Sequence, residues 1–514
     1  MIDGTFETHI TVAAGDAEGL SAFAAEHGLK FLHIELDRGC TPSQPMLTLR
    51  GSGAFDQQQA DVRDWCERLQ AVGIRPVRVK IEVTPWSAGV PQTDLEAREE
   101  PAERYFEHHI RVRLPSERVA DLLAVTDIAE RHGARLSRNA RRRGPGGGHE
   151  RFVNQRCRPV GRAAATERLD ALVADLRAAG QEVESVEQEY VVHDSHLGLD
   201  RGWLTPEVSH YQDWYEDRNR TAPAGPDFPP TYRPMPDGWG IEQRAAFDPA
   251  LKQHANAYTA GEPHFTDPRL GQRWRDARRN AMRHLLTVLA ATRWANHLVL
   301  RGSATMEAWV GRAAREPGDL DFVITPPTVT SDSADAHELF SGITAALATT
   351  PGAGLQPDQA TQSAIWTYER ADGRRIVIPF STPGLPDGSV QVDIVFGENL
   401  PMAPEPLTVL GVPVTAVTAG LSLAWKLQWL ATDMYPQGKD LYDAVLLAEH
   451  TTVDLALVRD LIRPELGDEA DRFTAVTVLG WTDIDWRNLT DAYPTIDGTV
   501  TDWLRRLALA LDQA

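Results

Sequence analysis

The chain has 514 residues, more than one hydrophobic core normally organises, because single cores stop growing near roughly 250–300 residues. We therefore expect roughly two or three domains. Hydrophobic residues make up 42% of the chain and charged residues 24%, the balance of an ordinary globular protein. The formal net charge of −21 disfavours general adhesion to nucleic acid or anionic lipid, so a phosphate-bearing partner requires a local basic patch.

The three cysteines, Cys40, Cys66 and Cys157, form no CxxC motif and no even set. We therefore expect neither a disulfide scaffold nor a structural zinc site. The first residues, MIDGTFETHITV, lack the basic and apolar regions of a signal peptide, and no stretch of about 18 apolar residues is available to span a bilayer. These features are typical of a cytoplasmic protein without a membrane partner.

An internal repeat organises the first part of the chain. The segment FETHITV at 6–12 returns as FEHHIRV at 106–112, and LQAVGIRPVRVKIEV from Leu69 returns as LRAAGQEVESVEQEYVV from Leu176. Alternating strands and two amphipathic helices are predicted in each copy, so each copy has the βαββαβ order of a ferredoxin-like unit. The helices are expected at about 16–27, 56–72, 116–132 and 162–180.

The composition changes after the repeats. Seven prolines lie between Pro206 and Pro236, interleaved with Trp and Tyr, which predicts an extended linker. Asp267 followed by Pro268 then predicts the start of a helix that runs to about Thr292. We expect an α+β fold in which two tandem ferredoxin-like units, 1–100 and 101–204, and a Pro-rich linker, 205–265, precede further strands and helices.

Three aspartates carry the most informative pattern. Asp319 and Asp321 lie two residues apart in DLDFVI, so on a strand both point to one face while the apolar residues point to the other. The same alternation in VQVDIVF at 390–396 places Asp393 opposite buried neighbours. Adjacent carboxylates repel unless a cation lies between them, so three on neighbouring strands predict a site for Mg²⁺ or Mn²⁺. A solvated surface strand is the alternative for the Asp pair alone.

A Gly-Ser turn before this pair predicts a phosphate-binding element. Gly302 allows the backbone to approach a phosphate, Ser303 adds a hydroxyl, and the predicted helix that follows presents free N–H groups. Metals held by carboxylates clamp the attacking and leaving oxygens in phosphoryl or nucleotidyl transfer. Each motif is weak alone, and their order along the chain favours this chemistry.

These motifs resemble the signature of the nucleotidyltransferase superfamily. The segment AGLSLAWKLQWLATDMYPQGKDLYDAVLLAEH at 419–450 is similar to the helical part of the AbiEii/AbiGii toxin family, in which a Lys-bearing helix precedes a KD-x-x-D helix. The resemblance covers about 270–455. It implies a nucleotidyltransferase-fold mixed sheet at 266–410 and a C-terminal helical domain at 411–514.

The resemblance also implies roles for individual residues. Asp319, Asp321 and Asp393 would be catalytic and would bind the metal. Nucleotide-binding residues would be Gly302, Ser303, Lys426, Lys439, Asp440 and Asp443, with both lysines as partners of the triphosphate and the last two aspartates orienting the site.

The spacing of these helical residues is compatible with such a site. Lys439 and Asp443 are four residues apart and are predicted to share one helix face, and Asp440 and Asp443 are three apart. An exposed Lys439–Asp443 pair of little energetic value is the alternative. For Lys426, the alternative is a solvent-facing position on an amphipathic helix.

The repeat region contains two further features. Residues 131–160 hold nine arginines and one acid, Glu150, a cluster that either binds RNA phosphates or a nucleotide or is simply solvated, with GPGGGH as a hairpin tip. His9-Ile10-Thr11 is similar to the HxT motif of two-histidine phosphoesterases. The second copy has His109-Ile110-Arg111, which breaks the pair, so both histidines are predicted to be partly packed strand residues.

The sequence therefore predicts a metal-dependent nucleotidyltransferase that moves a nucleoside monophosphate from an NTP to an acceptor hydroxyl and releases pyrophosphate. The acceptor would be an RNA 3′ end or a protein side chain. The resemblance implies a toxin or phage-defence setting with an antitoxin protein as partner. The alternative is a non-catalytic module that senses nucleotide or RNA.

Overall fold

The computed structural model divides the chain into two compact units, Met1–Val208 and Ser209–Ala514. It describes residues 2–140, 149–205, 235–243, 263–365, 372–433 and 435–513. Within these ranges no helix is long and apolar enough to cross a membrane. All three cysteines are free thiols.

The first unit runs twice through the order strand, helix, strand, strand, helix, strand. Its strands are β1 (Asp3–Val12), β2 (Lys30–Leu36), β3 (Ser43–Ala54), β4 (Pro76–Val83), β5 (Tyr105–Leu114), β6 (Ala134–Asn139), β7 (His149–Cys157) and β8 (Glu182–Asp194). Its helices are α1 (Ala17–His27), α2 (Phe55–Ala71), α4 (Val119–Arg131) and α5 (Arg162–Ala178), with a short α3 (Asp94–Ala97) between the halves. The four longer helices lie where the repeat predicted them.

The strands of the first unit close into one barrel, in the order β1-β3-β2-β6-β7-β5-β8-β4. Each half keeps its own order, β4-β1-β3-β2 and β8-β5-β7-β6, and antiparallel pairing of β2 with β6 and of β4 with β8 joins the halves. The sequence predicted two separate ferredoxin-like units, whereas the structure has one shared barrel. Closure gives every strand a partner on both sides, although β2 with β6 and β4 with β8 pair over only part of their lengths.

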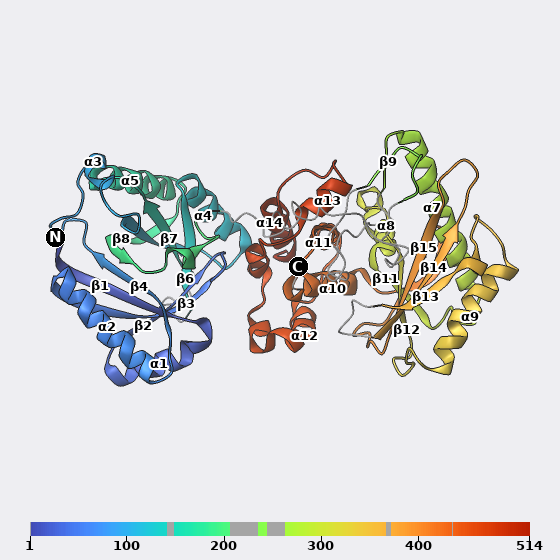
Figure 1. Ribbon diagram of the computed structural model, residues 1–514, viewed down its shortest axis with the longest axis horizontal. Coiled ribbons are helices and arrows are strands. Elements are labelled where there is room, and N and C mark those ends of the chain that lie inside the picture. The colour runs from blue at the N-terminus through green and yellow to red at the C-terminus, as the bar shows by residue number, and fades with distance from the viewer. Residues whose placement is uncertain are drawn as a thin grey trace. The chain divides into compact units, whose positions relative to one another are not determined.

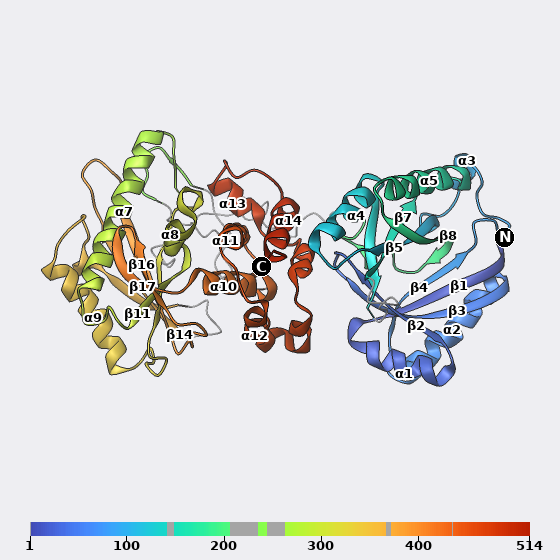
Figure 2. The same ribbon diagram turned by 180° about the vertical axis from the view of Figure 1, so that it is seen from behind.

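Helices cover the outside of this barrel, with α1 and α2 on the first half and α4 and α5 on the second (Figures 1 and 2). The alternation in FETHITV explains the arrangement. Phe6 and Ile10 face outward into a core with Leu20 of α1, while Glu7 and His9 line an interior cavity. Apolar residues therefore pack under the helices, and polar residues of the same strand point into the barrel.

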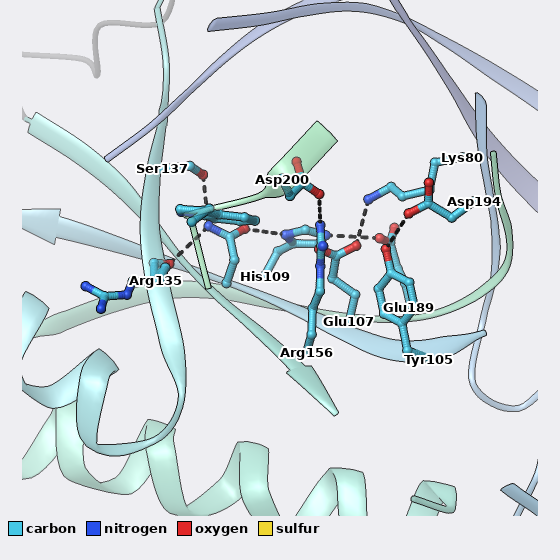
Figure 3. A network of polar contacts seen from close by, with 12 residues as sticks. Lys80, Tyr105, Glu107, His109, Arg135, Ser137, Arg156, Glu189, Asp194 and Asp200 are labelled. Carbon is cyan, nitrogen blue, oxygen red and sulfur yellow. Dashed lines mark hydrogen bonds and ion pairs between the residues drawn. The ribbon is translucent and has the colours of Figure 1, made fainter. Parts of the chain in front are cut away.

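Ion pairs balance the charges inside the barrel (Figure 3). Arg78 reaches Asp194 at 2.5 Å and Asp200 at 2.8 Å, and all three side chains are almost fully buried. Arg156 contacts Glu107 and Asp200, each at 2.8 Å. Burial disfavours ionisation of Arg78, but Asp200 and Asp194 outweigh burial and raise its pKa. The barrel interior thus depends on mutual neutralisation.

Replacing Arg78 tests this dependence. We expect Arg78→Met to lower the free energy of unfolding of the barrel by about 3–5 kcal/mol, because two acids lose their buried cation. The exposed neighbour Arg75 supplies the control, and Arg75→Met is expected to stay within about 0.5 kcal/mol. Hydrogen-exchange protection of the strand amides in the full chain measures both, and equal effects would contradict the network's role.

The second unit contains one mixed sheet in the order β13-β14-β15-β12-β11-β17-β16. Its strands are β11 (Leu298–Arg301), β12 (Leu320–Ile324), β13 (Thr361–Ala364), β14 (Asp372–Phe380), β15 (Gly388–Phe396), β16 (Glu405–Val409) and β17 (Val412–Ala416). Its helices are α7 (Pro268–Ala290), α8 (Met306–Val310), α9 (Ala334–Thr349), α10 (Ala419–Thr432), α11 (Gly438–His450), α12 (Leu455–Leu466), α13 (Trp486–Ala492) and α14 (Val500–Leu511).

Helices pack on both faces of this sheet (Figure 1). Residues of α7 and α9 share one hydrophobic core with β11, β12, β14 and β15. On the other side, Val299 and Val323 of the sheet pack with Leu421 and Trp425 of α10. Asp267 caps α7 by accepting a hydrogen bond from the backbone N–H of Arg269, as the Asp-Pro pair predicted. The sheet is therefore fixed between α7 and α9 on one face and α10 on the other.

Two predicted segments fall largely outside the described residues. Most of the predicted Pro-rich linker lies outside the described residues. Its described part includes the two-residue strand β9 (Ile241–Glu242), which pairs with β10 (His264–Phe265). The residues 141–148, with three of the nine arginines and most of GPGGGH, are also not described. Of the described arginines, Arg138 pairs with Glu35 and Arg156 with Glu107, so part of this cluster serves internal ion pairs.

Candidate active site

Three carboxylates meet at two neighbouring strands of the second unit. Strands β12 and β15 run parallel, and their register places Asp321 beside Asp393. Asp319 directly precedes β12. One carboxylate oxygen from each residue lies within 4.8 Å of the others, so the structure brings together the three aspartates that the sequence singled out.

The carboxylates repel one another strongly in this position. Burial, reinforced by the charges of Asp319 and Asp393, raises the pKa of Asp321 well above its ordinary value. Burial also raises the pKa of Asp393, against the opposing effect of Arg375. A divalent cation between the oxygens would remove this repulsion, and carboxylate oxygens are the donors that Mg²⁺ and Mn²⁺ prefer.

Arg375 and Gln391 donate hydrogen bonds to the carboxylate cluster, and neither residue was predicted to belong to the site. Arg375 donates from Nε and Nη2 to the two oxygens of Asp393, at 2.8 and 2.7 Å. Gln391 donates from Nε2 to Asp393 at 3.1 Å and to Asp319 at 3.3 Å. Gln391 was detectable, because it lies two residues before Asp393 on the same strand face. Arg375 was not, because its place opposite Asp393 depends on the pairing of β14 with β15.

The Gly-Ser turn lies against the same carboxylates. Gly302 has φ +77°, a conformation that favours glycine, and a Cβ there would lie 2.3 Å from Oδ2 of Asp321. Ser303 is 6% exposed. The helix expected after the turn is present but short, because α8 spans only Met306–Val310 and follows a 3-10 turn at Gly302–Thr305. Close backbone approach, more than a helix dipole, characterises this turn.

Replacing Gly302 tests the close approach. We expect Gly302→Ala to displace Asp321 and to destabilise the second unit, because the methyl group meets a carboxylate and the backbone is strained. Gly318 is the matched control, since a Cβ there meets nothing within 4 Å. Thermal unfolding of the two variants compares them, and an undiminished melting temperature for Gly302→Ala would contradict the crowding.

Comparison with known proteins identifies the second unit. Residues 283–500 match the family described as the nucleotidyl transferase AbiEii toxin of type IV toxin-antitoxin systems. The second unit carries an AbiEii nucleotidyltransferase domain. The match runs from α7 to α14. It includes the three aspartates of the carboxylate cluster and also Asp440 and Asp443.

Solved structures with nucleotidyltransferase titles also match. MenT4, a nucleotidyltransferase toxin from Mycobacterium tuberculosis H37Rv, is 19% identical, with a TM-score of 0.31 over 45% of this chain and 80% of that one. An antigenic nucleotidyltransferase-like protein from Paracoccidioides brasiliensis is 13% identical, with a TM-score of 0.25 over 44% of this chain and 94% of that one. Comparison with curated proteins gave no match.

A second cluster of charges in the AbiEii domain surrounds Lys426 of α10. Its Nζ lies 2.7 Å from Oδ1 of Asp440 and 3.2 Å from Oδ2 of Asp443. Burial disfavours the charged amine, but these two aspartates outweigh burial and raise the pKa of Lys426. The charge of Lys426 in turn opposes the rise in the pKa of Asp321. Lys426 is therefore not a solvent-facing helix residue but a fixed charge that acts on the carboxylate cluster.

Lys439 and Asp443 do not share one environment, which corrects the prediction from their spacing. Lys439 is exposed, while Asp443 is fully buried between Lys426 and Arg315. Side chains four residues apart on a helix point in directions that differ by about 40°. Here the boundary between the buried and the exposed face of α11 lies between these two directions. The exposed-pair interpretation is therefore wrong for Asp443.

Arg315 joins the loop before Asp319 to helix α11. Its Nε and Nη2 donate to Oδ1 and Oδ2 of Asp443, at 3.1 and 2.8 Å. The side chains of Arg315 and Asp443 are 7% and 0% exposed. This role of Arg315 was not predicted, because a contact across more than a hundred residues carries no local signal in the sequence.

Removing Arg315 tests whether it holds the loop. We expect Arg315→Met to cost about 3–5 kcal/mol, because Asp443 keeps a buried charge with one cation fewer. Arg312, exposed in the same loop, is the control, and Arg312→Met is expected to change stability by less than about 0.5 kcal/mol. Differential scanning calorimetry of the full chain reports the difference; indistinguishable transitions would refute the anchoring role.

Proposed function

We propose that the AbiEii domain transfers a nucleoside monophosphate from an NTP to an acceptor hydroxyl and releases pyrophosphate. The observation that carries the proposal is the convergence of Asp319, Asp321 and Asp393 beside the Gly302–Ser303 turn. Family membership of residues 283–500 supports nucleotidyl transfer as the reaction class. The carboxylates supply the metal ligands, and the turn supplies a close backbone approach for a phosphate.

The donor set fits a divalent cation. Asp319, Asp321 and Asp393 would hold Mg²⁺ or Mn²⁺, because they offer oxygen donors alone and their mutual repulsion favours a cation among them. When bound, such an ion would lower the pKa of the acceptor oxygen and neutralise charge that develops on the pyrophosphate. Gln391 and Arg375 would hold these oxygens in place, because both donate hydrogen bonds to Asp393.

Other residues would bind the nucleotide. Ser303 would donate its hydroxyl to a phosphate oxygen, with Gly302 permitting the approach. Lys426, held by Asp440 and Asp443, would place a fixed positive charge near the triphosphate. Exposed Lys439, at the start of α11, would contact the outer phosphates. This assignment keeps Lys426 as an internal charge and gives Lys439 the solvent-facing role.

The acceptor and the biological setting extend this proposal. An RNA 3′ end and a protein side chain both offer the hydroxyl that the reaction requires. The family description supports a toxin whose activity an antitoxin protein counteracts, in a setting such as phage defence. A cytoplasmic location would give the enzyme access to NTP and to either acceptor.

A non-catalytic nucleotide or RNA sensor is the second candidate. It is favoured by one observation, the ion pair of Arg375 with both oxygens of Asp393. A sensor would use Arg375 in place of a metal and would bind nucleotide without turnover. Calorimetric titration of nucleotide with and without Mg²⁺ separates the two, because only the enzyme requires the metal for productive binding.

The transfer reaction is tested by incubating the protein with each α-labelled NTP, Mg²⁺, total RNA and cell extract. We expect label in RNA or protein with the wild type, and background label with Asp319→Ala, because the metal loses a ligand. Asp335→Ala, which removes an exposed acid from the first turn of α9, is the control and should retain activity. An active Asp319→Ala variant would contradict the assignment of the carboxylates to the active site. Nucleotide binding without labelled product would favour the sensor.

A further inference from the structure

The barrel of the first unit contains histidines and glutamates in pairs related by the internal repeat. His9 of β1 corresponds to His109 of β5 in FETHITV and FEHHIRV. Glu82 of β4 corresponds to Glu189 of β8 in the segments that begin at Leu69 and Leu176. Both histidines were predicted to be partly packed strand residues, and in the structure both line one interior cavity of about 230 Å³.

The paired side chains meet at the same distance in both halves. Nε2 of His9 lies 3.2 Å from Oε2 of Glu82. Nε2 of His109 lies 3.2 Å from Oε2 of Glu189, and Figure 3 shows this second pair. Ligand atoms of Glu82, His109 and Glu189 all lie within 4.8 Å of one another. Among the described residues, this group and the three aspartates of the active site are the two such sets. Nitrogen and oxygen donors from both repeats therefore converge on one point.

The hydrogen bonds behind His109 orient its ring toward that point. Nδ1 of His109 lies 2.7 Å from Oδ1 of Asn154. The amide nitrogen of Asn154 donates to the backbone carbonyls of Arg135 and Phe152, so its oxygen faces the ring and accepts a hydrogen bond from Nδ1. Nε2 of His109 then faces the Glu189 carboxylate at 3.2 Å. A proton on Nε2 or a metal ion in its place supplies the positive charge between these two electron-rich groups.

The first repeat contains the same support. Nδ1 of His9 lies 3.1 Å from Oγ1 of Thr48, and Thr48 opposes His9 in the β1–β3 register as Asn154 opposes His109 in the β5–β7 register. A ring nitrogen held from behind while the other faces a ligand position is the usual arrangement of metal-binding histidines. Both repeats therefore supply a supported donor rather than a histidine packed by chance.

Glu82 adds a buried charge at the same place. It is 1% exposed, and neither carboxylate oxygen makes a hydrogen bond that meets normal geometry. Nε2 of His9 lies 3.2 Å away, and the ammonium of Lys80 lies 2.8 Å away and also contacts Glu107 at 2.7 Å. One ammonium therefore serves two buried acids, and oxygens of Glu82 and Glu189 lie within 4.8 Å of each other.

We propose that Glu82, His109 and Glu189, with His9 as the fourth donor, bind a divalent cation of the Zn²⁺ type inside the barrel. Imidazole nitrogens select a borderline cation over Mg²⁺, and mixed His and Glu donors are common zinc ligands. Zinc bonds of roughly 2.0–2.1 Å place two tetrahedral ligands about 3.3 Å apart, close to both His–Glu distances. The site would couple the two repeats and would be separate in residues and in metal class from the carboxylates of the AbiEii domain.

The test uses the full chain without a histidine tag and with Asp319→Ala and Asp321→Ala, so that the second unit does not contribute metal binding. After chelation, Zn²⁺ is titrated by calorimetry, and Co²⁺ absorption reports nitrogen and oxygen ligation. We expect one saturable site, weakened at least about tenfold by Glu82→Gln and by His109→Gln. Glu187→Gln is the matched control, because Glu187 lines the same cavity two residues from Glu189 and lies outside the donor set.

Glu82→Gln is isosteric and is therefore expected to fold. Circular dichroism of each variant checks that its secondary structure matches that of the wild type. No saturable Zn²⁺ uptake by the folded protein would show that the four residues form ion pairs only and would overturn the proposal. Binding that Glu82→Gln and His109→Gln leave unchanged would locate the metal elsewhere and would overturn it equally. A loss of affinity in Glu187→Gln as large as in Glu82→Gln would contradict the assigned donor set.

Discussion

Repulsion among three closely spaced carboxylates is the main electrostatic constraint on the second unit. Parallel pairing of β12 with β15 brings Asp321 beside Asp393, and the oxygens of all three aspartates lie within 4.8 Å. Arg375, Gln391 and Lys426 offset part of this charge from three different elements. The sheet order brings β12 beside β15, and the positive φ of Gly302 lets the backbone approach Asp321 closely. Clustered carboxylates are costly without a cation, and this cost supports the proposed metal-dependent transfer.

The first unit balances buried charge differently. Its barrel mixes both signs in the interior, so Arg78, Arg156 and Lys80 are each shared between two acids. Such networks stabilise only while every member is present, because an unpaired buried charge costs several kcal/mol. The repeat does not make this balance symmetric, because Arg78 and Lys80 in the first half correspond to Ser185 and Glu187 in the second. At these positions the β8 strand therefore has fewer cations and one more acid than β4, at the place where the histidine and glutamate pairs converge.

Local patterns in the sequence predicted much of this structure. Alternation and repeat register located the four long helices of the first unit, and the DxD motif and VQVDIVF strand located the carboxylates with their correct facing. Non-local pairing was beyond such patterns: closure of the barrel depends on β2 with β6 and β4 with β8, strands about a hundred residues apart. Arg375 was missed because it meets Asp393 only through the pairing of β14 with β15. Arg315 was missed because its partner Asp443 is distant in sequence. Helix spacing alone also misplaced Lys439, which lies just outside the buried face.

The fate of the NTP phosphates tests the central claim most directly. The same NTP, labelled in parallel at the α- and γ-phosphate, is incubated with the wild-type chain, Mg²⁺ and the acceptor mixture. A nucleotidyltransferase attaches the α-label to the acceptor and releases the γ-label as pyrophosphate, and this is the result that we predict. Transfer of the γ-label to the acceptor, or release of both labels without acceptor modification, would contradict the assignment of the carboxylate cluster to nucleotidyl transfer.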